Sequence, residues 1–323
     1  HREFLWQEGH TLHATPEEAI AETEQQLETY ANLCENILAM PVIRGQKTDK
    51  EKFAGAERTY TIECMMHDRK ALQAGTSHYF GDGFPTAFDI TFTDKNNQQT
   101  HPFETSWGLS TRIIGGIIMT HGDNNGLVLP PRIAPIQVII LPIAAHKPGV
   151  TEAAEQLVER LKNLGLRAKG DFSDNSPGWK FAEYEMKGVP LRIEIGPKDL
   201  EKNQCVAARR DNGEKITLSL SELEAKVPEL LDQVHNGLYE KAAKNIADHT
   251  YAAYSLEEAK QLQEEHGGFI KTMWCGNLQC ELDMKEKAGM TSRCIPFQQE
   301  HLGDVCPICG KPAKHMVVWG VAY

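Results

Sequence analysis

Apolar residues recur at steps of three and four between Pro16 and Pro41, and this period predicts a long helix with one buried face. Thr15, Pro16 and Glu18 stand in the order of a capping box with proline at the first helical position, so the helix should begin there. Pro41 cannot continue a helix and should end it. The positions of the buried face are Ala19, Leu27, Tyr30, Ala31, Cys34 and Leu38.

Shorter apolar segments follow, and they predict strands at residues 59–64 and 88–93, with residues 94–100 as a polar loop. Residues 109–119 predict an apolar helix. Its Gly115-Gly116 pair should cost roughly 0.5–1 kcal/mol per glycine relative to alanine. We therefore expect both glycines to pack closely against another backbone.

The pattern changes after a stiff, proline-rich connection near Ile133, where we expect a domain boundary. Strands are predicted at residues 137–141 and 191–195, and a helix at residues 151–164. Asp211-Asn212-Gly213 predicts a hairpin turn, so this section has an α/β pattern. A helix from about Ser221 leads to a third unit, which opens with a second capping box at Ser255.

Length and charge limit the function classes. At about 150 residues per domain, 323 residues suggest two or three domains. The formal charge of −11 argues against a protein that coats nucleic acid by bulk charge, so we expect no DNA partner. Residues 132–230 contain 15 basic and 15 acidic side chains, so the basic residues concentrate in the middle of the chain.

Hydropathy predicts no membrane partner. The longest strongly apolar run, residues 138–145, is far shorter than the roughly 20 residues that a membrane span needs. The N-terminus lacks the pattern of a secretory signal. We therefore expect a cytoplasmic protein with reduced cysteines.

Five of the eight cysteines lie in the last fifty residues. Cys275-x4-Cys280 and Cys306-Pro-Ile-Cys309 form two close pairs, the pattern of a structural Zn²⁺ site. A site closed by four thiolates leaves no open position for water, so this metal should not be catalytic. Ordinary buried or redox-active thiols are the alternative, and three further residues could replace a ligand: Cys294, His301 and His315.

Arg112 lies near the start of the predicted apolar helix, four residues after Gly108, which we expect to open it. A guanidinium beside a helix N-terminus suits a phosphate, although most single arginines there are solvated or paired with a carboxylate. Gln73, Thr76 and His78 lie in a small-residue turn that can expose polar groups to a ligand, although an isolated histidine is more often structural. The sequence contains no phosphate loop and no nucleophile–base pair, so covalent catalysis has no support.

Five segments together resemble prolyl-tRNA synthetases of the archaeal and eukaryotic type, which are class II aminoacyl-tRNA synthetases. They are Arg2–Thr11, Glu51–Ala56, Gln73–His78, Thr105–Arg112 and His121–Pro131. The resemblance implies an α+β and α/β multidomain protein. Its domains would be an antiparallel-sheet catalytic domain, here partial, at residues 1–132, an α/β anticodon-binding domain at residues 133–235, and a C-terminal α/β zinc-binding domain at residues 236–323.

The resemblance also implies site residues. Arg112 would be the catalytic arginine of motif 3 and hold the γ-phosphate of ATP. Tyr323 would reach back toward the active site. The other ATP-binding residues would be Phe4, Gln73 and Thr76, and the proline pocket would contain Trp6, Glu8, Phe53 and His78. The tRNA-binding residues would be Glu185, Arg192, Lys198 and Asp199, and the zinc ligands Cys275, Cys280, Cys306 and Cys309.

These features predict proline activation by ATP with Mg²⁺, followed by transfer of proline to tRNA(Pro), in a homodimer with a structural Zn²⁺. The chain begins inside motif 2, so we expect the natural protein to extend upstream. One alternative is a synthetase-like protein that binds tRNA without catalysis. Another is a different class II synthetase, for threonine or glycine, and a zinc-ribbon interaction protein would explain only the C-terminal residues.

Overall fold

The computed structural model describes residues 3–323, so Arg2 of the first resembling segment lies outside the described residues. The chain divides into two compact units. One contains the residues before Ile37, together with Pro41–Met119 and Ala243–Tyr323, and the other contains Ile37–Met40 and Thr120–Ala242. In the described part of the chain, no helix is both long enough and apolar enough to cross a membrane.

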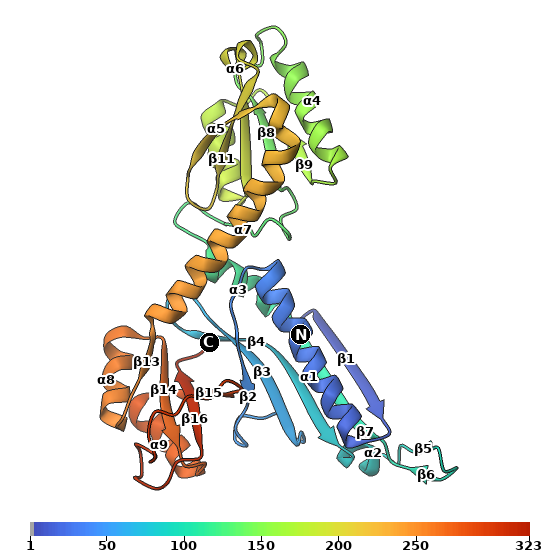
Figure 1. The fold of residues 1–323 in the computed structure, drawn as a ribbon, viewed down its shortest axis with the longest axis vertical. Helices are drawn as coiled ribbons and strands as arrows, with labels where there is room; N and C mark the ends of the chain where they lie inside the picture. The colour runs from blue at the N-terminus through green and yellow to red at the C-terminus, as the bar shows by residue number, and fades with distance from the viewer. Residues whose placement is uncertain (1–2) are drawn as a thin grey trace. The chain divides into compact units, whose positions relative to one another are not determined.

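The first unit is built on a nine-stranded sheet that joins N-terminal and C-terminal segments in the order β1-β7-β4-β3-β2-β15-β16-β14-β13 (Figure 1). Neighbouring strands are antiparallel except β13 and β14. A separate hairpin contains β5 (Phe92–Thr93) and β6 (Gln99–Thr100). The strands of the large sheet are β1 (Trp6–His13), β2 (Ile43–Gln46), β3 (Arg58–Met65), β4 (Ala71–Gly81), β7 (Phe103–Ser110), β13 (Thr250–Ala252), β14 (Phe269–Trp274), β15 (Thr291–Pro296) and β16 (His315–Gly320).

Helix α1 (Pro16–Asn32) packs on one face of β3, β4 and β7 (Figure 1) and continues into a π-helical turn, Leu33–Ile37. The predicted N-cap is confirmed, because the Glu18 amide donates to Thr15 Oγ1 at 3.2 Å. Ser77 faces this helix and donates from Oγ to the carbonyl oxygen of Thr23 at 2.7 Å. Since side chains alternate along a strand, Thr76 and His78 face the opposite side of the sheet.

Four further helices belong wholly or largely to this unit. The second predicted cap is confirmed, because Ser255 Oγ accepts from the Glu258 amide at 3.0 Å. The C-terminal helices pack on each other and on strands β14 and β15. The helices are α2 (Gly83–Ala87), α3 (Arg112–His121), α8 (Leu256–His266) and α9 (Leu278–Ala288).

Charged side chains are buried where β2 and β3 meet β15. Glu63 is fully buried, and its carboxylate accepts from Lys47 Nζ at 2.7 Å and from Arg293 Nε at 3.1 Å. Lys47 also donates to the carbonyl oxygen of Arg293 at 2.7 Å. This cluster ties the N-terminal strands to the C-terminal segment inside one unit.

The second unit contains a five-stranded sheet in the order β12-β11-β10-β8-β9, with β8, β9 and β10 parallel and the rest antiparallel. The strand predicted at residues 191–195 and the hairpin turn at Gly213, where φ is +74°, are confirmed. The strands are β8 (Val138–Pro142), β9 (Ala168–Gly170), β10 (Leu191–Ile195), β11 (Gln204–Arg209) and β12 (Lys215–Ser219). The helices are α4 (Val150–Asn163), α5 (Pro177–Met186), α6 (Pro197–Glu201), the 3-10 turn Leu220–Glu222 and α7 (Leu223–Asp248), which runs on into the first unit.

Several local predictions are wrong, and one of them is the loop expected at residues 94–100, of which Gln99 and Thr100 form β6. The strand expected at residues 88–93 is reduced to Phe92–Thr93, because α2 occupies the preceding residues and Asp89 adopts a left-handed φ of +54°. The apolar helix starts at Arg112 rather than Leu109, because Leu109 and Ser110 pair with β1. Gly108 therefore lies in β7 and does not open the helix.

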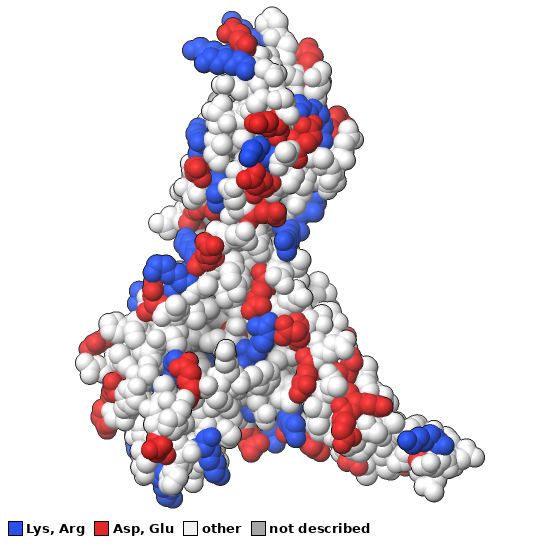
Figure 2. All heavy atoms as spheres, in the orientation of Figure 1, with Lys and Arg blue, Asp and Glu red and all other residues white. Residues whose placement is uncertain are grey.

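The basic side chains of the second unit are largely paired. Figure 2 shows Lys and Arg intermixed with Asp and Glu over the face in view. Arg160 lies 2.6 Å from Glu224, Arg209 lies 2.7 Å from Asp211, and Arg192 lies 2.9 Å from Glu194. The charged side chains on this face therefore do not form a uniform basic surface.

Candidate active site, anticodon pocket and metal centre

The strand register brings the predicted proline-pocket residues to one face of the large sheet. Gly108 on β7 lies between Glu8 on β1 and Thr76 on β4. Two residues further along the same strands, Ser106 lies between His10 and His78 in the same way. Directly opposite residues share a face and lie about 5 Å apart. Six predicted residues line one cavity of about 530 Å³, which we call the aromatic pocket: Trp6, Glu8, Phe53, Gln73, Thr76 and His78.

His78 is buried in this pocket between two hydroxyl groups. Its Nδ1 lies 2.9 Å from Thr59 Oγ1, and its Nε2 lies 3.0 Å from Thr76 Oγ1. Burial lowers the pKa of His78 to about 4. The imidazole is therefore neutral near pH 7, a fixed polar wall rather than a cation.

Aromatic rings form much of the rest of the wall, and four of them were not predicted from the sequence: Phe80, Phe84, Phe88 and Trp107. The Phe53 ring lies 5.0 Å from His78 and meets Phe80 edge to face at 5.8 Å, while Phe80 and Phe84 lie 5.2 Å apart. Alternation along β4 from Thr76 through His78 to Phe80 would have identified Phe80. Nothing local identified Phe84, because its helix was not predicted.

A β-bulge explains why Gln73 joins this face. Gly75 pairs with Ile62 and Gln73 with the next residue, Glu63, so Ala74 is the extra residue of β4. Strict alternation would place Gln73 on the face of Ser77. The bulge reverses this phase and brings Gln73 into the pocket beside Thr76.

Gly108 keeps the centre of this surface open. It lies opposite both Glu8 and Thr76, and a Cβ there would stand 3.3 Å from the Trp6 ring. A larger side chain would displace that ring or fill the pocket. The role of Gly108 is therefore to leave space on β7, and not to start a helix as we expected.

A second cavity of about 530 Å³, which we call the arginine pocket, is lined by Phe4, Trp6, Arg112, Gly115 and Tyr323 among others. Arg112 is exposed at the first position of α3, and its Nη1 donates to the carbonyl oxygen of Gln73 at 3.4 Å. Trp6 lines both cavities, so the two pockets adjoin at that residue.

Gly115 lies three residues after Arg112, on the same face of α3. The prediction that it packs against a backbone is wrong, because a Cβ there would meet nothing within 4 Å. The missing side chain instead leaves open space in the arginine pocket.

The C-terminus reaches this second cavity. Ala322 forms a parallel bridge with Ala71 at the start of β4, and the Tyr323 amide donates to the Ala71 carbonyl oxygen at 3.3 Å. The Tyr323 hydroxyl donates to Asp68, and Lys70 Nζ lies 5.1 Å from the centre of the tyrosine ring.

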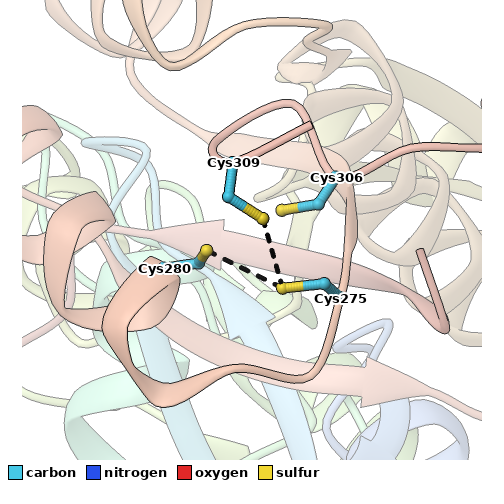
Figure 3. A group of neighbouring side chains, drawn as sticks. All are labelled: Cys275, Cys280, Cys306 and Cys309. Carbon is cyan, nitrogen blue, oxygen red and sulfur yellow. Dashed lines mark hydrogen bonds between the residues drawn. The ribbon is translucent and has the colours of Figure 1, made fainter. Parts of the chain in front are cut away.

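The four predicted zinc ligands converge in the C-terminal segment, with all sulfur atoms within 4.8 Å of one another (Figure 3). Cys275 directly follows β14, Cys280 lies on α9, and Cys306 and Cys309 come from the loop before β16. Cys275 Sγ lies 3.7 Å from Cys280 Sγ and 3.6 Å from Cys309 Sγ. Four sulfurs at 2.3 Å from a tetrahedral Zn²⁺ would be about 3.8 Å apart, so the residues fit this ion.

The alternative metal ligands lie outside this group. Cys294 is buried in a separate apolar cluster with Met273 and Val318. His301 is exposed and lies 3.2 Å from Asp304. Within the described residues, the metal-compatible group contains neither of these side chains nor His315.

The predicted tRNA-binding residues separate into two places in the second unit. Glu185 and Arg192 line a cavity of about 320 Å³, the anticodon pocket, in which the Arg192 guanidinium lies 4.1 Å from the Phe181 ring centre. Lys198 and Asp199 lie on α6 and do not line it. Asp199 caps that helix by accepting from the Gly196 amide at 2.9 Å.

Comparison with known protein families matches three consecutive parts of the chain. Residues 1–121 match the tRNA synthetase class II core domain (G, H, P, S and T), and residues 137–230 match an anticodon binding domain. Residues 256–323 match the C-terminal domain of prolyl-tRNA synthetase.

The similar proteins are named as proline--tRNA ligases. Proline--tRNA ligase of Clostridium novyi is 60% identical over 321 residues, and that of Lachnospira eligens is 58% identical over 322 residues. Proline--tRNA ligase 2 of Bacillus thuringiensis is 57% identical over 321 residues. The alignments cover 99–100% of this chain and 67% of each relative.

All three relatives are bacterial, so they do not support the assignment to an archaeal or eukaryotic type. They agree with the C-terminal domain match on the amino acid, because both specify proline. The threonyl, glycyl and non-catalytic alternatives are not favoured. The chain therefore belongs to the prolyl-tRNA synthetase family of class II aminoacyl-tRNA synthetases, the ligases that join proline to tRNA.

Proposed function

We propose that the aromatic pocket binds proline and the adjoining arginine pocket binds ATP. The observation that carries this proposal is the convergence of separate chain segments on one sheet face, where Trp6, Glu8, Phe53 and His78 line one cavity. A small, mostly apolar imino acid suits aromatic walls with few polar groups. Glu8 would pair with the proline ammonium group, while Phe53 and Trp6 would contact its ring.

Membership of the class II synthetases implies the use of ATP and Mg²⁺. In the proposed reaction a proline carboxylate oxygen attacks the α-phosphorus of ATP, and the bond to pyrophosphate breaks. A terminal hydroxyl of tRNA then attacks the prolyl carbonyl carbon, and AMP leaves. When bound, Mg²⁺ neutralises phosphate charge.

This chain's own residues would position the reactants. Arg112 would hold the γ-phosphate at the start of α3, where backbone amides also favour an anion. Gln73 and Thr76 line the aromatic pocket and would contact ATP from there, with the Gln73 carbonyl oxygen beside Arg112. Phe4 would stack on adenine in the arginine pocket. Such chemistry needs orientation and charge neutralisation rather than a covalent nucleophile.

The test is proline-dependent ATP–pyrophosphate exchange by the full-length protein and its Arg112→Ala variant. We expect exchange to fall by about 100-fold or more, in the range measured for removal of one transition-state donor. Lys95→Ala removes an exposed cation outside both pockets and serves as the control. Unchanged exchange in Arg112→Ala, with a normal unfolding temperature, would overturn the assignment.

In the second unit, Glu185 and Arg192 would read a base of the tRNA(Pro) anticodon in the anticodon pocket. Lys198 and Asp199 would contact the tRNA from α6. Cys275, Cys280, Cys306 and Cys309 would hold one structural Zn²⁺, which is supported by the fit of their sulfur spacing to a tetrahedral ion.

We further propose three domains at residues 1–132, 133–235 and 236–323, in the layout of the archaeal and eukaryotic type although the compared relatives are bacterial. A homodimer in the cytoplasm completes the proposal. Light scattering of the full-length protein would test its oligomeric state, and a monomeric mass would contradict that part.

A further inference from the structure

We propose that Asn125 is a positioning residue for anticodon recognition, because it holds the Glu185 carboxylate in place inside the anticodon pocket. This inference rests on the proposed function of Glu185 as a base-reading residue. Asn125 lies outside that set of residues, in the segment that connects α3 to the five-stranded sheet.

The contact joins the two side chains directly. Asn125 Nδ2 donates to Glu185 Oε1 at 3.0 Å. In the described part of the chain, Glu185 Oε2 has no side-chain donor, so both of its acceptor positions are open to a ligand in the pocket that Glu185 lines. A base edge that presents N–H groups, such as the Watson–Crick edge of guanine, supplies that donor.

The loop that carries Asn125 has a defined shape. Asp123 and Gly126 exchange backbone hydrogen bonds at 3.1 and 3.2 Å, and the Asn125 amide donates to Asp123 Oδ1 at 2.9 Å. Gly126 has φ +132°, and a Cβ there would stand 2.6 Å from the Met186 backbone. Only glycine allows the loop to approach the end of α5 so closely.

Arg210, which directly follows β11, also attaches the loop to the backbone of Glu185 on α5. The Arg210 guanidinium lies 2.6 and 2.7 Å from the two Asp123 carboxylate oxygens, and its Nε donates to the Glu185 carbonyl oxygen at 2.9 Å. The Leu127 amide donates to the Met186 carbonyl oxygen at 3.0 Å. Glu185 is therefore held at its backbone by Arg210 and at its carboxylate by Asn125.

This arrangement matters because a glutamate side chain has three rotatable bonds and loses rotamer freedom when it binds a base. A donor that already fixes the carboxylate reduces that loss, which is preorganisation. The Asp123–Arg210 contact that attaches the loop is bidentate, and the guanidinium lowers the pKa of Asp123 to about 2.

The experiment measures aminoacylation kcat/KM of the full-length protein with tRNA(Pro) transcripts in which each anticodon base is changed in turn. We expect Asn125→Ala to lower kcat/KM for the native tRNA by about tenfold, the scale of one hydrogen bond to a charged group. For a transcript changed at the base that Glu185 reads, Asn125→Ala should lower kcat/KM little further, because the contact that Asn125 supports is already missing. Discrimination at that anticodon position should therefore fall by about the same factor.

Two further variants sharpen the comparison. Asn125→Asp keeps the size of the side chain but places a carboxylate against Glu185. It should therefore lower kcat/KM for the native tRNA more than Asn125→Ala does. Asn124→Ala removes the neighbouring asparagine, for which the described structure contains no side-chain hydrogen bond, and should keep wild-type values. Thermal unfolding of each variant checks that the fold is retained.

The possible results distinguish positioning by Asn125 from base reading by Glu185. If Asn125→Ala slows all transcripts equally, or changes none, the positioning inference is overturned. If Glu185→Ala abolishes discrimination and Asn125→Ala leaves it at the wild-type level, this inference fails alone. If Glu185→Ala itself leaves discrimination intact, the base-reading part of the proposed function is wrong.

Discussion

His78 illustrates how a single side chain acquires its properties from its surroundings. Two threonine hydroxyls satisfy its ring nitrogens, and burial lowers its pKa to about 4. Because the folded pKa lies below the unfolded value of about 6.5, the unfolded state binds the proton more readily. The stability contributed by His78 is therefore fully present above pH 6.5 and is lost as the pH falls toward 4.

We expect the ring protons of His78 to keep the chemical shift of a neutral imidazole from pH 7.5 down to pH 5. The measurement is a proton NMR titration, with the resonance assigned by its absence from His78→Gln. A midpoint near pH 6.5 would contradict the buried, neutral state.

At the scale of elements, the buried cluster of Lys47, Glu63 and Arg293 holds β2, β3 and β15 together. Lys47→Met leaves the fully buried Glu63 with one partner fewer and should lower the free energy of unfolding by about 3–5 kcal/mol. Urea denaturation measures this change. Lys52→Met, which removes an ion pair to the exposed Asp49, is the matched control and should cost about 1 kcal/mol or less. Equal losses in the two variants would refute a special contribution of the buried cluster.

The cysteine group connects β14, α9 and the loop before β16. Because a metal bound only by the folded chain contributes to its stability, Cys306→Ser should reduce the bound zinc and speed hydrogen exchange first at residues 275–309. Elemental analysis and exchange mass spectrometry measure both effects. Cys294→Ser changes a buried cysteine outside the group, so this variant should contain as much zinc as the unaltered protein. Wild-type exchange rates after complete chelation would argue against a structural ion.

At the scale of the whole molecule, C-terminal strands complete the sheet that carries the aromatic pocket. β15 pairs with β2, so a chain that ends after Asp248 would expose the edge of β2 and remove Arg293 from Glu63. We expect such a chain to have a clearly lower unfolding temperature in calorimetry. A chain lacking only Tyr323 is the control, and indistinguishable melting of both shortened chains would show that the C-terminal strands do not stabilise the sheet.

Much of the proposed site was accessible from the sequence through the motifs of the family. Trp6, Glu8, Phe53 and His78 were predicted as a group, and the structure places them in one cavity. The bulge that brings Gln73 to the same face and the approach of Phe84 were not predictable, because both depend on pairing and packing with distant residues.

The sequence by itself determined the local features: the caps at Thr15 and Ser255, the hairpin turn at Gly213 and the spacing of the cysteines. Each depends on a few neighbouring residues, whose conformational preferences act at short range. The tertiary structure alone decided that β15 joins β2 and that Lys47 contacts Arg293, 246 residues away. Strand edges present similar backbone groups, so their partners are selected by long-range packing and burial rather than by local pattern.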